Sequence, residues 1–353
     1  MENLIHSKTS KDMTASNKLN ELAIEIIQQC PNCCIHCSSY SDLCKANVMP
    51  VEKVKEVIND AKDLGAKLIC ISGGEPFLHE GLKEIVDYIK SKDLECNIYS
   101  SGIFYDGGKY SCIPMSLLEG IANSVTKLIV NYETADSVTY DKIMGTSCNG
   151  LSMLEETITS AISLGITVEA HFVPMAINYR HINSVVSRCE ELGVKKVSFL
   201  RLVMQGRAKQ NRSLTELSQN QMAQLMDELK ALKNEKASGI RLGIPFSQNK
   251  LSCSTCHAGS TKISIRYDGL VYPCEAFKND EPKGMVSAKP ESIYDKRFAD
   301  IYSNSEYLIQ VRQLVAQFKS QHHCESCVNQ YYRSPEVKDG AYEPAGPEDI
   351  LTL

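Results

Sequence analysis

The chain has 353 residues, 43% of them hydrophobic, which is enough for one large buried core or for one large and one small domain. Its formal net charge is -5, with acidic and basic residues interspersed, so electrostatics give no basis for binding nucleic acid or an anionic membrane. No apolar run approaches the roughly 20 residues that span a bilayer, and the polar segment 1–20 lacks a signal-peptide core.

The first part of the chain predicts alternating strands and helices. Residues 1–18 are rich in Ser, Thr, Lys and Asn and are predicted to form a mobile arm. The predicted strands are 22–28, 67–72, 95–100, 126–131, 167–173 and 195–202, and the predicted helices include 51–64, 82–91, 151–164 and 179–192. Six strand–helix units in succession imply parallel strands with right-handed crossovers, in an open sheet or a partial barrel.

Three cysteines follow the first predicted strand with the spacing CxxxCxxC, namely Cys30, Cys34 and Cys37. Thiolates this close on one loop can bind one metal centre, and three of them leave a four-iron cluster with one iron open. Zinc sites more often combine two separate pairs of ligands, each a CxxC or a pair of histidines, so a zinc knuckle is the less favoured alternative. Cys33 lies inside the loop but off this spacing, and we leave it out of the ligand set.

The second predicted strand runs directly into Gly73-Gly74-Glu75-Pro76. Paired glycines allow the backbone to approach a ligand closely, and a carboxylate at a strand end can accept a hydrogen bond from an ammonium group. Alone, these four residues could form only a turn. The later predicted strands also carry polar residues near their carboxyl ends, which parallel strands place at the same end of the sheet. Each is either a functional group or a structural polar group. They are Ser100, Ser101, Asn131, Glu133, Glu169, His171 and Arg201.

The pattern changes after the sixth predicted strand, and this change suggests the domain limits. We expect a core over 19–205, a connector and helix over 206–240, a second, smaller domain over 241–335 and a C-terminal tail over 336–353. The connector is polar and basic, and the helix is predicted over 215–235.

The predicted smaller domain carries a second set of four cysteines. Two of them flank a hairpin signal at Tyr267-Asp268-Gly269, and the other two form a CxxC: Cys256, Cys274, Cys324 and Cys327. Four thiolates supplied by two pairs of cysteines suit a structural zinc ion at least as well as an iron–sulfur cluster. Cys253 is an alternative ligand, because it shares a short loop with Cys256.

CxxxCxxC and Gly-Gly-Glu-Pro together resemble the radical S-adenosylmethionine (SAM) enzymes, and the resemblance covers nearly the whole chain. It implies an α/β fold with a partial (β/α)6 TIM-type barrel, and a SAM-binding 4Fe–4S cluster on Cys30, Cys34 and Cys37. In that family, reductive cleavage of SAM gives a 5'-deoxyadenosyl radical that abstracts a substrate hydrogen.

The resemblance also implies roles around the SAM site. Gly73, Gly74, Glu75 and Pro76 match the segment that binds the SAM amino group, and Ser100 and Ser101 lie where family members often place a polar residue near the ribose. Well-studied members hold the SAM carboxylate with a serine on the fourth strand and an arginine in the next helix. This chain has Asn131 and the region around Met144 there, so the carboxylate partner stays open.

The stretch from Cys256 to Cys274 resembles the auxiliary-cluster region of the SPASM and twitch subfamilies. Full SPASM domains carry further cysteines after the CxxC, but none follows Cys327 in this chain. The resemblance therefore implies the shorter twitch type, with a single auxiliary 4Fe–4S cluster. Four protein thiolates around it would suit electron transfer or structural support.

Three functions follow as hypotheses. The first is a radical SAM enzyme that modifies a peptide or protein, as in peptide maturation, although only about twenty residues precede the first strand, too few for a fused leader-binding module. The second is dehydrogenation or rearrangement of a small molecule. The third is a non-catalytic iron–sulfur or zinc redox sensor, which would not need a SAM amino-group site.

A radical SAM enzyme implies a flavodoxin- or ferredoxin-type electron donor. The many cysteines without a targeting signal indicate the reducing cytoplasm.

Overall fold

A computed structural model describes residues 18–146, 149–234, 241–243, 256–279 and 284–321. The predicted N-terminal arm, except for Lys18, and the predicted C-terminal tail lie outside these residues. So do Cys253, Cys324 and Cys327 of the second cysteine set.

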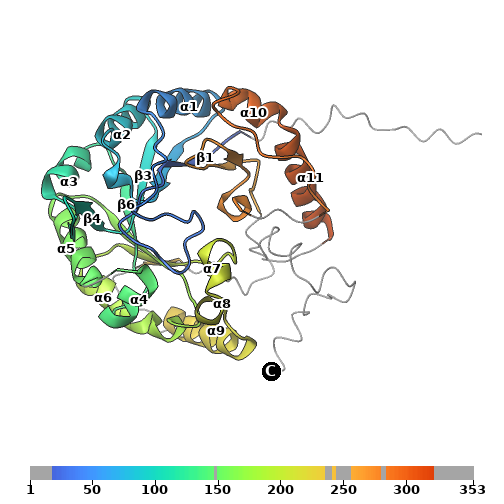
Figure 1. Cartoon of the computed structure of the whole chain (residues 1–353). Coiled ribbons are helices and arrows are strands. Elements are labelled where there is room, and N and C mark those ends of the chain that lie inside the picture. Colours follow the sequence, from blue (N-terminus) through green and yellow to red (C-terminus); the bar gives the residue numbers. More distant parts are fainter. Residues whose placement is uncertain (1–17, 147–148, 235–240, 244–255, 280–283, 322–353) are drawn as a thin grey trace, which may run out of the picture.

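Six parallel strands form the centre of one curved sheet, and they correspond to the six predicted strands (Figure 1). They are β1 (Glu21–Ile27), β2 (Leu68–Gly73), β3 (Glu95–Ser100), β6 (Lys127–Asn131), β7 (Val168–Phe172) and β8 (Lys196–Phe199). Each pairs in parallel with the next. The partial barrel of strand–helix units is therefore confirmed, and its strands all end at one mouth.

Helices cover the outer side of this sheet (Figure 1). They are α1 (Val51–Asp63), α2 (Leu82–Ser91), α3 (Met115–Ala122), α5 (Gly150–Ser163), α6 (Ile182–Glu191) and α9 (Gln219–Asn234). Successive strand residues face opposite sides, so β1 presents Leu22, Ile24 and Ile26 to one side, all fully buried in the hydrophobic core. Burial of each such side chain stabilises the fold by about 1.5–3 kcal/mol.

The opposite face of the sheet is polar and lines the inside of the barrel. Lys262 pairs with Glu21 at 3.0 Å, and Lys127 pairs with Glu169 at 3.0 Å. Paired charges of this kind avoid the high cost of burying an isolated charge. The barrel interior is therefore suited to polar groups.

Several elements differ from the sequence predictions. The predicted helix over 179–192 begins as a 3₁₀ turn, η2 (Tyr179–His181), before α6, and the predicted strand over 195–202 already ends at Phe199. After Phe199 the chain turns toward the cysteine loop, where Arg207 bonds the Cys37 carbonyl. Elements without a prediction include the hairpin β4 (Ile103–Asp106) with β5 (Lys109–Cys112), α3, α4 (Ser137–Met144), α7 (Arg207–Gln210), α8 (Arg212–Thr215), β9 (Arg241–Gly243) and α10 (Phe298–Asn304).

Strands from the predicted smaller domain extend the core sheet at both edges. β9 pairs with β8, and β10 (Lys262–Ile265) pairs in parallel with β1. β11 (Val271–Tyr272) returns antiparallel to β10, as the hairpin signal predicts. The described part of this region is thus continuous with the barrel sheet, while the domain limits drawn from the sequence stay a prediction.

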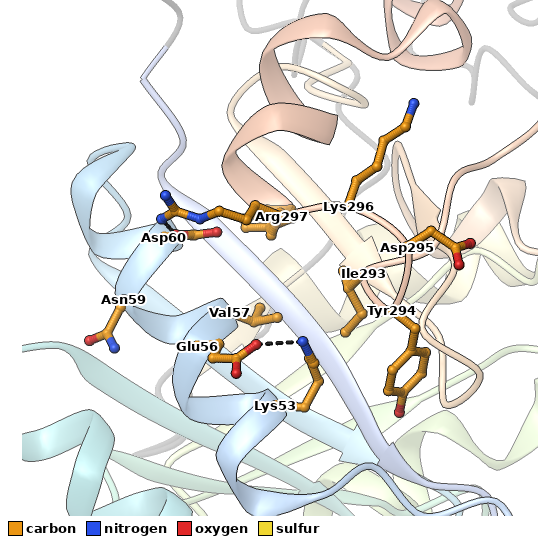
Figure 2. A pocket seen from close by; sticks show the side chains of 11 residues that line it. Lys53, Glu56, Val57, Asn59, Asp60, Ile293, Tyr294, Asp295, Lys296 and Arg297 are labelled. Atoms are coloured by element: carbon orange, nitrogen blue, oxygen red, sulfur yellow. Dashed lines mark hydrogen bonds and ion pairs between the residues drawn. The ribbon is translucent and has the colours of Figure 1, made fainter.

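Two further helices, α10 (Phe298–Asn304) and α11 (Glu306–Gln321), continue the outer ring next to α1 (Figure 1). Arg297 forms an ion pair with Asp60 of α1, and the Ala299 N–H donates to the same carboxylate at 3.1 Å. Figure 2 shows the Arg297 side chain directed at Asp60. Both residues line a cleft of about 400 Å³. This cleft lies in the outer helix layer, so we assign it to the anchoring of α10 rather than to the barrel mouth. No helix in the described ranges is long and apolar enough to cross a membrane.

Candidate active site

The loop that carries Cys30, Cys34 and Cys37 leaves β1 at the mouth of the barrel. Cys30 is buried, while Cys34 and Cys37 are partly exposed, and none of the three forms a disulfide. The last turn of α4 holds this loop through backbone bonds, from Cys33 N to the Met144 carbonyl at 3.0 Å and from Ile35 N to the Ile143 carbonyl at 2.9 Å. The loop is therefore an ordered part of the fold with its thiols at the strand ends.

Arg207 fastens the same loop from the other side. Its guanidinium donates to the carbonyl of Cys34 at 2.7 Å and to that of Ser41 at 2.7 Å, and its backbone N–H donates to the carbonyl of Cys37 at 3.0 Å. No local sequence pattern marks this residue, which lies 173 positions after Cys34.

The paired glycines at the end of β2 lie closer to the backbone at the end of β1 than any residue with a side chain could. A Cβ at Gly74 would lie 2.0 Å from the Gln29 carbonyl oxygen, and one at Gly73 would lie 2.2 Å from that of Ile27. Real Cβ atoms do not approach a backbone oxygen so closely. The end of β2 therefore runs directly against the start of the cysteine loop.

The donor set fits an iron–sulfur cluster. Within the described ranges, no group of three or more His, Cys, Asp or Glu side chains is arranged to hold a single metal ion. In a four-iron cluster each thiolate binds a different iron, so its ligands stand farther apart than the ligands of one zinc ion. The three thiols of Cys30, Cys34 and Cys37, supplied by one loop, could bind three irons of such a cluster and leave the fourth open.

Buried groups in the loop are also consistent with a bound cluster. Burial, then the neighbouring Cys34 thiol, raises the pKa of Cys30, and burial raises the pKa of Cys34 as well, so both are neutral until cations displace their protons. The side chain of Asn32 is 1% exposed, and neither its Oδ1 nor its Nδ2 has a hydrogen-bond partner in the described part of the chain. Such a group is expected beside a bound cofactor.

Glu75 ties the end of β2 to the end of β3. Its carboxylate is fully buried and accepts hydrogen bonds from Ser101 Oγ at 2.6 Å, Ser101 N at 2.8 Å and Ser100 Oγ at 2.8 Å, with Phe77 N at 3.3 Å. Burial raises the pKa of this carboxyl group, and the hydrogen bonds from Ser101 act against that shift. These bonds occupy about all four lone-pair sites of a carboxylate, so Glu75 shapes the segment Gly73–Pro76. Direct contacts of Glu75, Ser100, Ser101 and this segment with SAM stay predictions.

A second buried carboxylate, Glu133, follows β6. It accepts from Val173 N at 2.8 Å and from Asn131 Nδ2 at 3.2 Å, and it faces His36 Nε2 at 3.4 Å. His36 lies between Cys34 and Cys37, so the network reaches into the cysteine loop. His36 is not among the residues predicted from the sequence, although its position inside the cysteine motif is a signal. Asn131 thus has a structural partner, and its role toward SAM stays a prediction.

The three candidate catalytic residues have different surroundings. Glu169 is paired with Lys127 inside the barrel. The His171 ring lies 5.4 Å from that of Tyr99, and burial lowers the pKa of His171 to about 4, so the imidazole is neutral at physiological pH. Arg201 lies in a largely apolar cleft of about 400 Å³ between the ends of β7 and β8 and the helices α8 and α9. Their catalytic roles stay predictions.

The described members of the second cysteine set are brought together by the β10–β11 hairpin. Cys274 directly precedes the 3₁₀ turn η3 (Glu275–Phe277), and Cys256 precedes β10. The N–H of Gly259 donates to the Pro273 carbonyl at 2.9 Å, which joins the segments beside the two cysteines. Both cysteines are partly exposed.

Comparison with known proteins decides the family. The model of the radical SAM superfamily matches residues 24–199, and the model of the SPASM iron–sulfur cluster-binding domain matches residues 256–328. The chain belongs to the radical SAM superfamily. Radical SAM proteins bind SAM and a 4Fe–4S cluster, and the SPASM match adds auxiliary iron–sulfur binding, so the cofactors expected from the sequence are confirmed. The number of auxiliary clusters, expected to be one, stays a prediction.

Individual radical SAM proteins are similar over most of the chain. A probable GTP 3',8-cyclase of Methanococcus maripaludis is 24% identical over 73% of this chain and 85% of its own length. A PqqA peptide cyclase of Xanthomonas axonopodis pv. citri is 23% identical over 82% of this chain and 75% of its own length. The crystal structure of Streptococcus suis SuiB bound to S-adenosylmethionine superposes with a TM-score of 0.68 at 16% identity, over 91% of this chain and 80% of that one.

Proposed function

We propose that this radical SAM enzyme modifies a peptide or protein. The observation that carries the proposal is the likeness to PqqA peptide cyclase, which extends over 82% of the chain and thus well beyond the radical SAM core. SuiB, whose fold is similar, has also been crystallised with its precursor peptide SuiA. The polar lining of the barrel, with paired charges at Lys127–Glu169, suits the amide groups of a peptide.

In this proposal the cysteine loop and the segment after β2 form the cofactor site. Cys30, Cys34 and Cys37 hold the SAM-binding cluster, and the segment Gly73–Pro76 binds the SAM amino group. When bound, cluster and SAM together supply a 5'-deoxyadenosyl radical for hydrogen abstraction. Arg207 and the end of α4 hold the loop, and neutral His171 borders the substrate space from β7.

The second cysteine set holds the auxiliary cluster in the same proposal. Cys256 and Cys274 are two of its ligands, and Cys324 and Cys327 complete the set. A flavodoxin- or ferredoxin-type protein donates the electron. We place the enzyme in the cytoplasm, because a reducing compartment keeps thiol ligands available for iron.

A small-molecule substrate is the second candidate, because the matched GTP 3',8-cyclase covers 73% of this chain at similar identity. The two candidates call for a common experiment. The reconstituted, reduced enzyme is incubated without oxygen with SAM and, in parallel, with GTP or with synthetic peptides encoded by the reading frames that flank its gene.

We expect a covalent mass change on one peptide, with more 5'-deoxyadenosine than in the reaction without peptide. A variant with Cys30, Cys34 and Cys37 replaced by alanine is the control and should give neither product. Conversion of GTP with every peptide unchanged would contradict the peptide proposal in favour of a small-molecule enzyme. If iron-loaded protein cleaved no SAM at all, the redox-sensor hypothesis would have to replace both.

A further inference from the structure

A buried lysine connects the two cysteine regions. Lys278 lies four residues after Cys274, and its ammonium pairs with the Glu25 carboxylate near the end of β1. The same ammonium donates to Ser39 Oγ at 3.1 Å, and Ser39 Oγ donates to Glu25 Oε1 at 2.6 Å. The side chains of Lys278 and Glu25 are each only 5% exposed. This buried triad joins β1, the residues after Cys37 and the segment after Cys274.

Further contacts join the same two segments independently of the triad. Asn279 Nδ2 donates to the Ser38 carbonyl. Gln205 Nε2 donates to the Glu275 carbonyl at 2.7 Å, and two residues later the Arg207 N–H donates to the Cys37 carbonyl at 3.0 Å. The segment after Cys274 is therefore fixed to the cysteine loop directly through Lys278 and Asn279, and indirectly through 205–207.

The lysine is charged in this environment. Burial lowers the pKa of Lys278, but attraction to Glu25 and the hydrogen bond between them outweigh it, so the pKa lies above its ordinary value. Ser39, which accepts from this ammonium at 3.1 Å, lies two residues after Cys37, so the positive charge is held beside the cysteine loop. A cation held near an iron–sulfur cluster favours the extra negative charge of its reduced state.

We propose that Lys278 is a positioning residue that fixes the cysteine loop to the segment after Cys274 and raises the reduction potential of the SAM-binding cluster. The proposal rests on the assignment of Cys30, Cys34 and Cys37 as ligands of that cluster. It gives the auxiliary region a role toward the first cluster that needs no direct contact between the two clusters.

The test is a redox titration of the reconstituted full-length protein, followed by electron paramagnetic resonance. The signal that changes when SAM is added identifies the SAM-binding cluster. Lys278→Met should shift the midpoint potential of this signal to a more negative value. Lys55→Met is the matched control, because Lys55 of α1 pairs with Glu84 of α2 in the outer helix layer, away from both cysteine regions. It should leave the potential at the wild-type value.

A second readout uses the protein without iron. In hydrogen exchange, Lys278→Met should lose protection in 38–41 and in 275–279 together, while Lys55→Met should not. If Lys278→Met fails to fold, the double variant Glu25→Gln/Lys278→Met removes both buried charges. The double variant should fold and load iron, but still lose protection around Ser39, because Ser39 Oγ loses both charged partners.

The outcomes separate the proposal from the cluster assignment. An unshifted potential in Lys278→Met with wild-type exchange around Ser39 would overturn the proposal alone, as would an equal shift in Lys55→Met. If the wild-type protein gave no SAM-sensitive signal, the cluster assignment would fall, and the proposal with it.

Discussion

The two cysteine sets differ in how the chain brings their members together. The first lies within the eight residues 30–37, on a loop whose shape is enforced by close backbone contacts with β2, α4 and Arg207. The described members of the second, Cys256 and Cys274, have seventeen residues between them, and the β10–β11 hairpin lies in this interval. The first set is therefore part of the barrel itself, and the second depends on a region added to the edge of its sheet. Damage to one set should leave the other largely intact.

The largest expected effect follows from removal of the first set. With Cys30, Cys34 and Cys37 replaced by alanine, the protein should lose about half of its iron and all SAM cleavage, because no open-iron cluster remains to bind SAM. Iron analysis and chromatography of 5'-deoxyadenosine measure both. Cys33→Ala changes the same loop off the ligand spacing and should retain both properties. A triple variant that still cleaves SAM would show that the first set is not the SAM-binding site.

Gly74→Ala tests whether the contact between β2 and the cysteine loop is as tight as its geometry indicates. The added Cβ would lie 2.0 Å from the Gln29 carbonyl, so the loop must move. We expect a loss of stability of about 2–4 kcal/mol and a large loss of SAM binding. Gly120→Ala in α3 is the control, since the nearest atom to its Cβ is 3.6 Å away. Its melting temperature should stay the same or rise slightly, and equal losses in the two variants would contradict the account.

Replacement of Cys324 and Cys327 by alanine tests the other side of the comparison. The variant should lose about half of the iron and most substrate turnover, while cleavage of SAM without substrate persists, because that reaction needs only the first set. Limited proteolysis should cut more readily after residue 240 or so, with the barrel intact. Cys253→Ala should keep all its iron. Full iron and turnover in the double variant would reopen Cys253 as a ligand.

The smallest effect is expected at Glu75, within the first region. Glu75→Ala removes the acceptor that joins the ends of β2 and β3. A charge-assisted hydrogen bond from the SAM ammonium, predicted for the segment that Glu75 shapes, contributes roughly 1.5–3 kcal/mol. SAM affinity should fall about tenfold to a hundredfold, without loss of iron. Isothermal titration calorimetry measures this, and Glu75→Gln, which keeps one carbonyl acceptor, should lose less. Unchanged affinity in Glu75→Ala would place the amino-group site elsewhere.

Local sequence accounts for what could be predicted. The spacing of Cys30, Cys34 and Cys37 is a local pattern, and the strands around it follow from runs of β-branched residues, so β1 and β2 lie within one residue of their predicted limits. The β4–β5 hairpin also had a local signal, Gly107-Gly108 between short strands, but four-residue strands are weak signals.

The long-range contacts of the site could not be predicted. Arg207 meets Cys34 across 173 positions and Lys278 meets Glu25 across 253, and only the folded partial barrel brings these pairs together. The same holds for Glu75, whose sequence position suggests a ligand contact but whose carboxylate is surrounded by Ser100 and Ser101. Burial of a polar group and the identity of its partners are properties of the tertiary fold.

The most direct test of the central claim is the metal content and SAM cleavage of the wild-type protein after reconstitution without oxygen. With a chemical reductant and SAM, it should hold about eight irons per chain as two four-iron clusters, contain little zinc, and form 5'-deoxyadenosine and methionine. Protein that purifies with zinc at these cysteines, or that holds its full iron yet leaves SAM intact, would contradict the account.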